Sequence, residues 1–335
     1  MHGHRPRPQG PRHRTRGDAP GRAGPGVAGS GGLRAGAGVN TAGVRVTVPA
    51  STANLGSGFD ALGLALGLYD VVEVTVTESG VKGTVSGEGA DLVVDENHLV
   101  VRALMATAGT LDLELPGVEL ACVNTIPHAR GLGSSAAAVV AGIAAGYALA
   151  DRELDDAALQ LAAAFEGHAD NAAASLHGGL ALAWSTPGPT YQAVRFEPHP
   201  ALRPVVLVPA EHSATSLTRG LLPSAVPHVD AAFAAGRCAL AVHALTTWPD
   251  LLLTATEDRL HQDYRANAWP NTMRVVRELR ANGVAATVSG AGPAVFAATT
   301  DGRLPTGVDT AGFTVRELPV DRDGVRTERI GTNSR

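Results

Sequence analysis

The stretch at residues 127–138 (PHARGLGSSAAA) most constrains this chain, because glycine, serine and alanine directly precede a long run of small apolar residues. Glycine lets backbone N–H groups approach an anion closely, and the first turn of a helix adds unbonded N–H groups and a positive dipole end. The hydroxyls of Ser134 and Ser135 can bond phosphate oxygens or ligate Mg²⁺. A glycine-rich connection capped by serine is the structural alternative. The stretch predicts a phosphate cradle that opens a helix at about Ser134.

Lysine chemistry is almost absent, since Lys82 is the one lysine among 335 residues. The chain therefore has no Walker-type Gly-Lys-Ser/Thr, no Schiff-base lysine and no Val-Ala-Ile-Lys strand of the protein-kinase type. Its two cysteines, Cys122 and Cys238, match no metal or redox spacing. We expect both thiols to be reduced, in agreement with a cytoplasmic location.

The first 40 residues carry seven Arg and one Asp, whereas the whole chain has a net charge of −5, so the body is acidic. An acidic body disfavours nucleic acid as the main partner. Residues 1–43 hold almost no large apolar side chains and lack a signal peptide, so we expect a disordered leader. An overlong gene start and a nucleic-acid-binding arm are the alternatives. No stretch reaches the roughly 18 apolar residues that cross a bilayer, so no membrane partner is expected.

The pattern of apolar residues predicts an α+β fold of two domains and a tail. Strands and helices alternate irregularly, and a Pro-containing break falls near residues 196–204. We expect a first domain at 44–200, a second at 201–325 and a frayed tail at 326–335. Helices are expected at 97–110, from 134 onward, after Asp155, and at 231–253 and 269–281. Strands are expected at 44–49, 69–77, 81–87 (as a hairpin partner), 118–124, 180–184, 193–196, 204–208, 285–290, 294–299 and 313–318, with a loop at 50–58.

Four stretches in order resemble one known family. Residues 126–138 (IPHARGLGSSAAA) resemble the phosphate loop of the GHMP kinases, named for galactose, homoserine, mevalonate and phosphomevalonate. Residues 48–64 (VPASTANLGSGFDALGL) and 166–179 (EGHADNAAASLHGG) resemble the homoserine kinases in particular, and 287–296 (TVSGAGPAVF) resembles the third glycine motif. Together they anchor roughly residues 44–300. Ala294 stands where the family often has Thr.

The resemblance implies a ribosomal-protein-like N-terminal domain, a ferredoxin-like C-terminal domain and a homodimer. It implies ATP- and Mg²⁺-dependent phosphorylation of the L-homoserine hydroxyl, a step toward threonine. The nucleotide would then contact the following residues: Asn97, Pro127, Arg130, Gly131, Leu132, Gly133, Ser134, Ser135, Ala136 and Ala137.

For catalysis, the resemblance implies that Ser135 and Glu166 hold Mg²⁺, although a solvated helix-end carboxylate is the alternative for Glu166. Asp170 occupies the position where some relatives keep an aspartate base, and Asn171 is implied at the substrate hydroxyl. An amide does not titrate usefully, and phosphoryl transfer depends mostly on positioning and charge neutralisation. We therefore hypothesise transition-state stabilisation without a dedicated side-chain base.

An amino-acid pocket must bind an ammonium, a carboxylate and a hydroxyl. Asp60 and Asn54 are candidates for the ammonium and hydroxyl end. A carboxylate is best met by planar arginine forks, for which Arg219 and Arg265 fit the family. Surface positions are the alternative for both arginines. His168, Asn171 and Thr215 complete the expected pocket, with a packing role as the alternative for His168.

Two rival functions remain open at this point. Another GHMP kinase acting on mevalonate or a related alcohol would leave Asp60 without an ammonium partner, which is costly. A non-catalytic ligand- or nucleic-acid-binding protein on the same fold would not need Ser135, Glu166 and Asn171 together.

Overall fold

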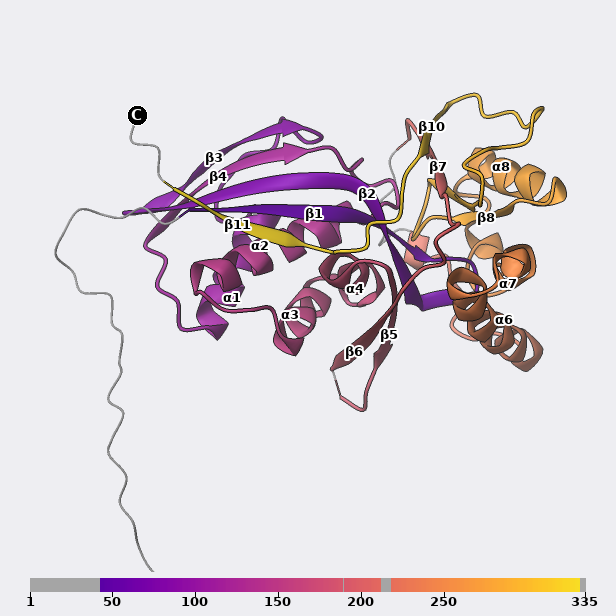
Figure 1. Ribbon diagram of the computed structural model, residues 1–335, viewed down its shortest axis with the longest axis horizontal. Helices are drawn as coiled ribbons and strands as arrows, with labels where there is room; N and C mark the ends of the chain where they lie inside the picture. The colour runs from indigo at the N-terminus through magenta and orange to yellow at the C-terminus, as the bar shows by residue number, and fades with distance from the viewer. Residues whose placement is uncertain (1–42, 189, 212–217, 332–335) are drawn as a thin grey trace, which may run out of the picture. The chain divides into compact units, whose positions relative to one another are not determined.

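The computed structural model describes residues 43–188, 190–211 and 218–331. All of the predicted leader except Gly43 lies outside the described residues, and so do Thr215 and the last four residues. Two sheets and their helices make up the described part of the chain, as Figure 1 shows.

The larger sheet has the order β11-β1-β2-β4-β3, and the β5–β6 hairpin joins it through β2. Its outer face is polar and its inner face apolar: Val44, Val46 and Val48 of β1 are fully buried, whereas Arg45 between them is exposed. Burying each valine contributes about 1.5–3 kcal/mol relative to exposing it. The strands of this sheet are β1 (Gly43–Asn54), β2 (Gly58–Thr77), β3 (Gly80–Gly87), β4 (Gly117–Asn124), β5 (Leu180–Ser185), β6 (Tyr191–Phe196) and β11 (Arg326–Ile330).

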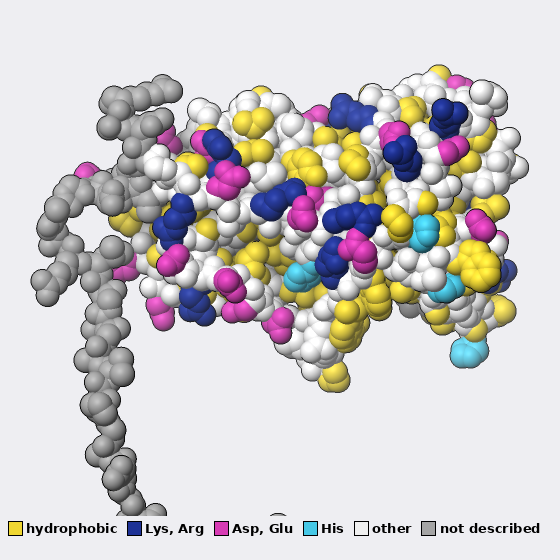
Figure 2. Space-filling view, viewed as in Figure 1, with side chains coloured by type: hydrophobic (Ala, Val, Ile, Leu, Met, Phe, Trp, Pro, Cys, Tyr) yellow, Lys and Arg dark blue, Asp and Glu magenta, His cyan; other side chains and the backbone are white. Residues whose placement is uncertain are grey.

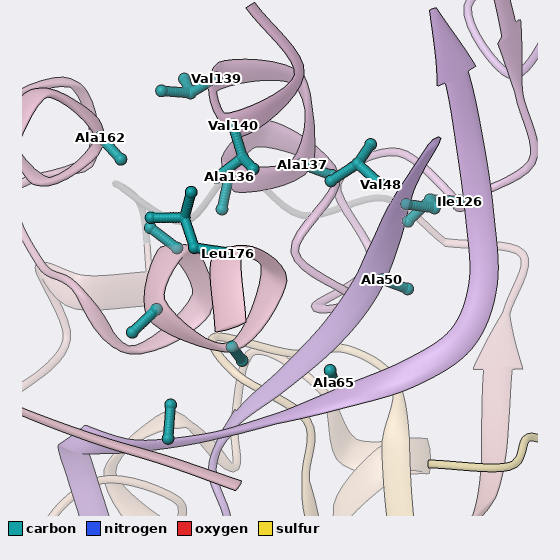
Figure 3. Close-up of a cluster of buried hydrophobic side chains, with 14 of the residues drawn as sticks. Val48, Ala50, Ala65, Ile126, Ala136, Ala137, Val139, Val140, Ala162 and Leu176 are labelled. Carbon is teal, nitrogen blue, oxygen red and sulfur yellow. The ribbon is translucent and has the colours of Figure 1, made fainter. Parts of the chain in front are cut away.

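Four helices cover the inner face of this sheet (Figure 1). They are α1 (Leu99–Thr110), α2 (Ser134–Leu149), α3 (Asp156–Glu166) and α4 (Asp170–His177). Their apolar side chains and those of β1 form one cluster, in which Figure 3 shows Leu176 of α4 beside α2 and Val48 of β1 near Ala137. α2 is apolar on nearly every side because it lies in the middle of this layer.

The smaller sheet has the order β10-β7-β9-β8, and helices pack around it. Its strands are β7 (Val205–Pro209), β8 (Ala285–Val288), β9 (Val295–Ala298) and β10 (Phe313–Glu317). The accompanying helices are α6 (His228–Thr246), α7 (Leu252–Ala255) and α8 (Pro270–Ala281), with short 3₁₀ turns at Pro249–Leu251 and Asp263–Arg265. α6 is the one described helix long and apolar enough to cross a bilayer by length and composition, and it buries Ala241, Ala244 and Leu245 in the core.

Three sequence expectations are wrong. β3 is not a hairpin partner of β2: it pairs in parallel with β4 from Gly80↔Gly117 to Gly87↔Asn124, and α1 lies in the crossover between them. Residues 326–330 are not a tail, because β11 pairs with β1 from Thr47↔Arg326 to Gly43↔Ile330. Residues 50–54 are not a loop but the end of β1, where polar Ser51 and Thr52 are fully buried. The expected helix starts at Ser134 and near Asp155 are confirmed.

Charged side chains of both signs intermingle on the face shown in Figure 2. Among the ion pairs of the protein, Arg45–Glu73 and Lys82–Glu119 are both solvent-exposed. Exposed pairs of this kind contribute only about 0–1 kcal/mol each. The stability of the fold therefore rests on the apolar clusters and not on its surface charges.

Candidate active site

A cavity of about 200 Å³ gathers residues from all four sequence motifs. The motif residues come from loops and element ends at which β1, β2, α2, α3, α4 and the β8–β9 turn meet. The cavity is lined by Asn54, Phe59, Asp60, Ala129, Gly131, Gly133, Ser134, Ser135, Ala136, Glu166, His168, Asp170, Asn171, Arg219, Arg265, Gly290 and Ala291.

The N-terminus of α2 opens into this cavity without a cap. Gly133 occupies the N-cap position with φ 70°, no side chain caps the helix, and its first turn holds no acidic residue. The N–H of Ala137 already donates to the Gly133 carbonyl at 2.8 Å, so the N–H groups of the first three helical residues lack intrahelical acceptors. The helix thus presents unbonded donors and a positive dipole end to the cavity, as an anion site requires.

The phosphate-loop stretch is fastened to the third glycine motif. The Ser289 hydroxyl donates to the Gly131 carbonyl at 2.6 Å, and the Ala294 N–H donates to the Arg130 carbonyl at 3.1 Å. Gly131 has φ 82°, and a Cβ there would lie 2.2 Å from the Ser289 carbonyl oxygen. Only glycine fits this approach, so the two stretches, distant in sequence, form one rigid floor.

Ser135 and Glu166 are in direct contact. The Ser135 hydroxyl donates to Glu166 Oε1 at 2.5 Å, because α3 ends where α2 begins. Both are oxygen ligands at the mouth of the cavity, and Mg²⁺ prefers one or two protein oxygens completed by phosphates and water. Among the described residues no group of three or more His, Cys, Asp or Glu could hold a metal by itself. This donor set fits a metal that shares its coordination shell with a nucleotide.

The Asn171 amide has a fixed orientation. Its Oδ1 accepts a hydrogen bond from the Ser51 hydroxyl at 3.0 Å, so its Nδ2 remains as a donor for the cavity. A Cβ at Gly133 would lie 2.2 Å from Ser51 Oγ and 3.0 Å from Asn171 Oδ1, so glycine is needed for the loop to lie against this pair. Ser51 is a residue that the sequence interpretation missed.

Asp170 is buried and already engaged. Its Oδ1 lies 2.7 Å from Nδ1 of His168 and accepts the N–H of Asn171 at 2.8 Å. Burial opposes protonation of His168, but the hydrogen bond and charge of Asp170 outweigh it, so the pKa of His168 lies above its ordinary value. Asp170 therefore fixes the position of the His168 ring in the wall of the cavity.

Asp60 and Arg219 form a two-point ion pair with both N–O distances at 2.8 Å. The backbone of Asp60 has φ 55°, and its N–H donates to Asn54 Oδ1 at 3.0 Å. Asn54 Nδ2 in turn donates to the Gly290 carbonyl at 2.8 Å. Both ends of the Asn54 amide are thus used in holding Asp60 in place.

Arg265 is 1% exposed and lies in the same cavity wall. Its guanidinium contacts the Thr218 carbonyl and His261 Nδ1, each at 3.2 Å, and stands over the Phe59 ring at 5.6 Å. Burial lowers the pKa of Arg265. A buried cation that faces a cavity is suited to an anionic group of a ligand.

A second cavity, of about 410 Å³, adjoins the first through Ser134 and Ser135. Its lining is mostly apolar, and it includes Asn97 and the half-buried His98, whose pKa burial lowers. Asp70, which sequence interpretation also missed, accepts the N–H groups of Thr125 and Ile126 and so fixes the start of the phosphate-loop stretch.

Four of the residues expected to contact the nucleotide line neither of these two cavities, and their contacts with it stay predictions. The side chains of Leu132, which precedes α2, and of Ala137, in the first turn of α2, are buried in the core and line neither cavity. Pro127 and Arg130 line a third cavity, next to β7 and β10, where Arg130 pairs with Glu88 at 3.2 Å.

Comparison with known proteins agrees with the resemblance to GHMP kinases found in the sequence motifs. The model described as GHMP kinases N terminal domain matches residues 97–179, and that described as GHMP kinases C terminal matches residues 239–306. A homoserine kinase of Rhodococcus opacus is 53% identical over 308 residues, which are 85% of this chain and 98% of that protein. A homoserine kinase of Streptomyces avermitilis is 54% identical over 268 residues, 78% of this chain and 88% of that protein.

Solved structures share the fold at lower identity. The homoserine kinase of Cytophaga hutchinsonii has a TM-score of 0.73 at 24% identity. The alignment covers 89% of this chain and 100% of the Cytophaga chain. Mevalonate diphosphate decarboxylase of Staphylococcus aureus has a TM-score of 0.61 at 17% identity, covering 86% of this chain and 98% of its own. These likenesses confirm the two-domain α+β fold but do not select a substrate. The sequence relatives are more specific, and on their evidence the chain belongs to the homoserine kinase family of the GHMP kinases.

Proposed function

We propose that this chain transfers the γ-phosphoryl group of ATP to the side-chain hydroxyl of L-homoserine, giving O-phospho-L-homoserine and ADP. One observation carries the proposal: a single cavity of about 200 Å³ holds the uncapped start of α2 together with Asp60, Arg219 and Arg265. A phosphate cradle beside charges suited to an amino-acid head group provides the positioning on which phosphoryl transfer depends.

The nucleotide is assigned to the two adjoining cavities. Its phosphates would accept hydrogen bonds from the backbone N–H groups of residues 134–136, where the first three helical donors are unbonded. The larger, mostly apolar cavity that contains Asn97 would take the base. The shared lining of Ser134 and Ser135 supports one continuous ligand that spans both.

Ser135 and Glu166 are the residues that would hold Mg²⁺, since their oxygens are 2.5 Å apart at the mouth of the cavity. When bound, the ion would neutralise charge on the β- and γ-phosphates. The cofactor assignment rests on this donor set and on the kinase family.

The reacting hydroxyl is assigned to Asn171. Because Ser51 fixes its Oδ1, the Nδ2–H would donate to the hydroxyl or to the transferred phosphoryl group. Asp170 is committed to His168 and to the Asn171 backbone, which supports a positioning role for it. We retain the hypothesis of transition-state stabilisation without a dedicated side-chain base.

The amino-acid head group is assigned to Asp60 for the ammonium and to Arg219 and Arg265 for the carboxylate. Asn54 also positions Asp60, because its Oδ1 and one of its Nδ2–H groups are bonded within the protein, and its expected contact with the substrate stays a prediction. The role expected for Thr215 stays a prediction, as that residue lies outside the described part of the chain. The homodimer, the cytoplasmic location and the boundary between domains at residue 200 also stay predictions.

A coupled assay of ADP release tests the proposal. Purified protein with Mg²⁺ and ATP is given L-homoserine, mevalonate or buffer alone. We expect ADP release that depends on L-homoserine. Release that depends on mevalonate instead, or none above buffer, would overturn the assignment.

A further inference from the structure

The Asp60–Arg219 ion pair uses the two groups that the proposed function assigns to the substrate's head group. Arg219 Nη1 and Nη2 contact Asp60 Oδ2 and Oδ1, each at 2.8 Å, so the guanidinium and the carboxylate satisfy one another. The two side chains remain 40% and 36% exposed and border the cavity. A ligand that needs both groups must therefore separate them or bind beside them.

The surroundings fix one partner more firmly than the other. Asp60 is held at its backbone by Asn54, which is anchored to the turn at Gly290. Arg219 is a half-exposed side chain whose guanidinium stands over the Phe59 ring at 5.7 Å. If the pair separates, Arg219 is therefore the partner that would move, since the backbone of Asp60 is held by Asn54.

Arg265 adds a second cation beside the Asp60–Arg219 pair. It is buried, its guanidinium lies 5.6 Å from the Phe59 centroid, and among the described residues it forms no ion pair within 4.0 Å, although the charges of Asp60 and Asp258 act on it from farther away. A carboxylate placed between Arg265 and Arg219 would give the buried cation a counter-ion, which two arginine forks accommodate well.

We propose that the Asp60–Arg219 pair is an internal placeholder which the zwitterionic head group of the substrate replaces, so that the site accepts α-amino acids and rejects alcohols carrying only one of the two charges. This inference rests on the proposed function. In the exchange, the substrate ammonium takes the place of Arg219 beside Asp60, and the substrate carboxylate takes the place of Asp60 beside Arg219. No charge is left without a partner.

A ligand with a single charge cannot complete the exchange. 4-Hydroxybutyrate, which is homoserine without its ammonium, would take Arg219 and leave Asp60 without its cationic partner. 3-Amino-1-propanol, which lacks the carboxylate, would leave Arg219 without its anionic partner. Loss of one charge-assisted partner of this kind costs about 10-fold or more in affinity. The pair therefore selects for both charges, beyond the attraction of each.

The test uses variants that should bind L-homoserine more weakly but bind a ligand with a single charge more tightly. Asp60→Asn removes the placeholder's anion, so it should weaken L-homoserine binding yet tighten 4-hydroxybutyrate binding by about 10-fold relative to wild type, measured by calorimetry. Arg219→Gln should likewise weaken L-homoserine binding, but it should tighten the binding of 3-amino-1-propanol. The second variant keeps the test decisive should the first fail to fold.

Two controls separate exchange from a simple change in charge. Asp170→Asn removes the same charge from the same cavity without freeing Arg219, and should not tighten 4-hydroxybutyrate. Glu73→Gln breaks the exposed Arg45–Glu73 pair on the outer face of the large sheet and should leave every constant unchanged.

The placeholder would be overturned if Asp60→Asn and Asp170→Asn tightened 4-hydroxybutyrate binding equally. It would also be overturned if Asp60→Asn did not tighten 4-hydroxybutyrate binding and Arg219→Gln did not tighten 3-amino-1-propanol binding. The proposed function fails separately. If wild-type protein releases no ADP with L-homoserine, the substrate assignment is wrong whatever the variants bind. If wild-type protein does release ADP with L-homoserine but neither variant binds its single-charge ligand more tightly, only the placeholder is wrong.

Discussion

The hydroxyl of Ser51 on β1 donates to Oδ1 of Asn171 on α4 at 3.0 Å, across 120 positions of sequence. This contact decides which end of the Asn171 amide faces the cavity. It therefore links the end of a buried strand to the group proposed to act on the substrate hydroxyl.

Replacing Ser51 with alanine should free the Asn171 amide to rotate. We expect kcat to fall by about 10-fold, less than the 10²–10³-fold loss typical of deleting an oriented donor outright. KM for L-homoserine should change little, since the head-group contacts remain. Steady-state kinetics measure both, and Thr110→Ala, which removes an exposed hydroxyl at the end of α1, serves as the control. An unchanged kcat in Ser51→Ala would contradict the assigned orientation.

Asp170→Asn tests whether the buried carboxylate is a base. Because Asp170 is bonded to His168 and to the Asn171 backbone, we expect the variant to lose about 10-fold or less in kcat, with a larger effect on KM for L-homoserine. General bases contribute about 10²–10⁴-fold. A kcat loss beyond about 10³-fold would show Asp170 to be the base and would refute a transfer without one.

Gly131→Ala should weaken ATP binding and stability more than a matched glycine substitution. Gly131 and Gly283 have φ of 82° and 83°, but a Cβ meets the Ser289 carbonyl at 2.2 Å at Gly131 and nothing within 4 Å at Gly283. Both variants carry left-handed strain of about 1–2 kcal/mol. Thermal melting and KM for ATP separate the clash from the strain, and equal losses in both variants would contradict the close approach.

Glu166→Gln should raise the Mg²⁺ concentration needed for half-maximal rate. The carboxylate is one of two protein oxygens at the proposed ion site, and loss of its charge should cost at least about 10-fold in apparent metal affinity. Titration of Mg²⁺ at fixed ATP gives this value. The exposed Glu153→Gln is the matched control, and identical Mg²⁺ curves for the two variants would argue against the site.

The His168–Asp170 contact predicts a pH-dependent stability. The folded pKa of His168 is raised above the ordinary 6.5, so folding favours the protonated form. The stabilisation is fully present below about pH 6.5 and is lost as pH rises through the folded pKa. The difference in unfolding free energy between wild type and His168→Gln should therefore be larger at pH 6 than at pH 9 in denaturant titrations. A difference that grows with pH would contradict the ion pair.

The elements with strong periodicity or clear end signals were predictable from sequence. The start of α2 follows from its glycines, and Asp155 caps α3 by accepting the Ala157 N–H. The pairing of β3 was not predictable, because a parallel partner depends on the crossover through α1 and not on the strand itself. β11 (RTERI) reads as polar and exposed, yet it completes the edge of the sheet beside β1.

The candidate site was predictable where motifs carry it, and less so where contacts between distant segments decide it. Ser135 and Glu166 were expected together and lie together. Ser51 could not be recognised as a partner of Asn171, because a serine in an apparent loop carries no signal of a contact 120 positions away. Its place inside the VPASTANLGSGFD stretch was the one available hint.

Identification of the phosphorylated product tests the central claim most directly. The protein is incubated with ATP, Mg²⁺ and an equimolar mixture of L-homoserine and mevalonate, and the product is identified by ³¹P–¹H correlation and mass spectrometry. We predict a phosphate monoester of the side-chain hydroxyl of L-homoserine, formed in equal amount to ADP. A phosphorylated mevalonate, or inorganic phosphate without an ester, would contradict it.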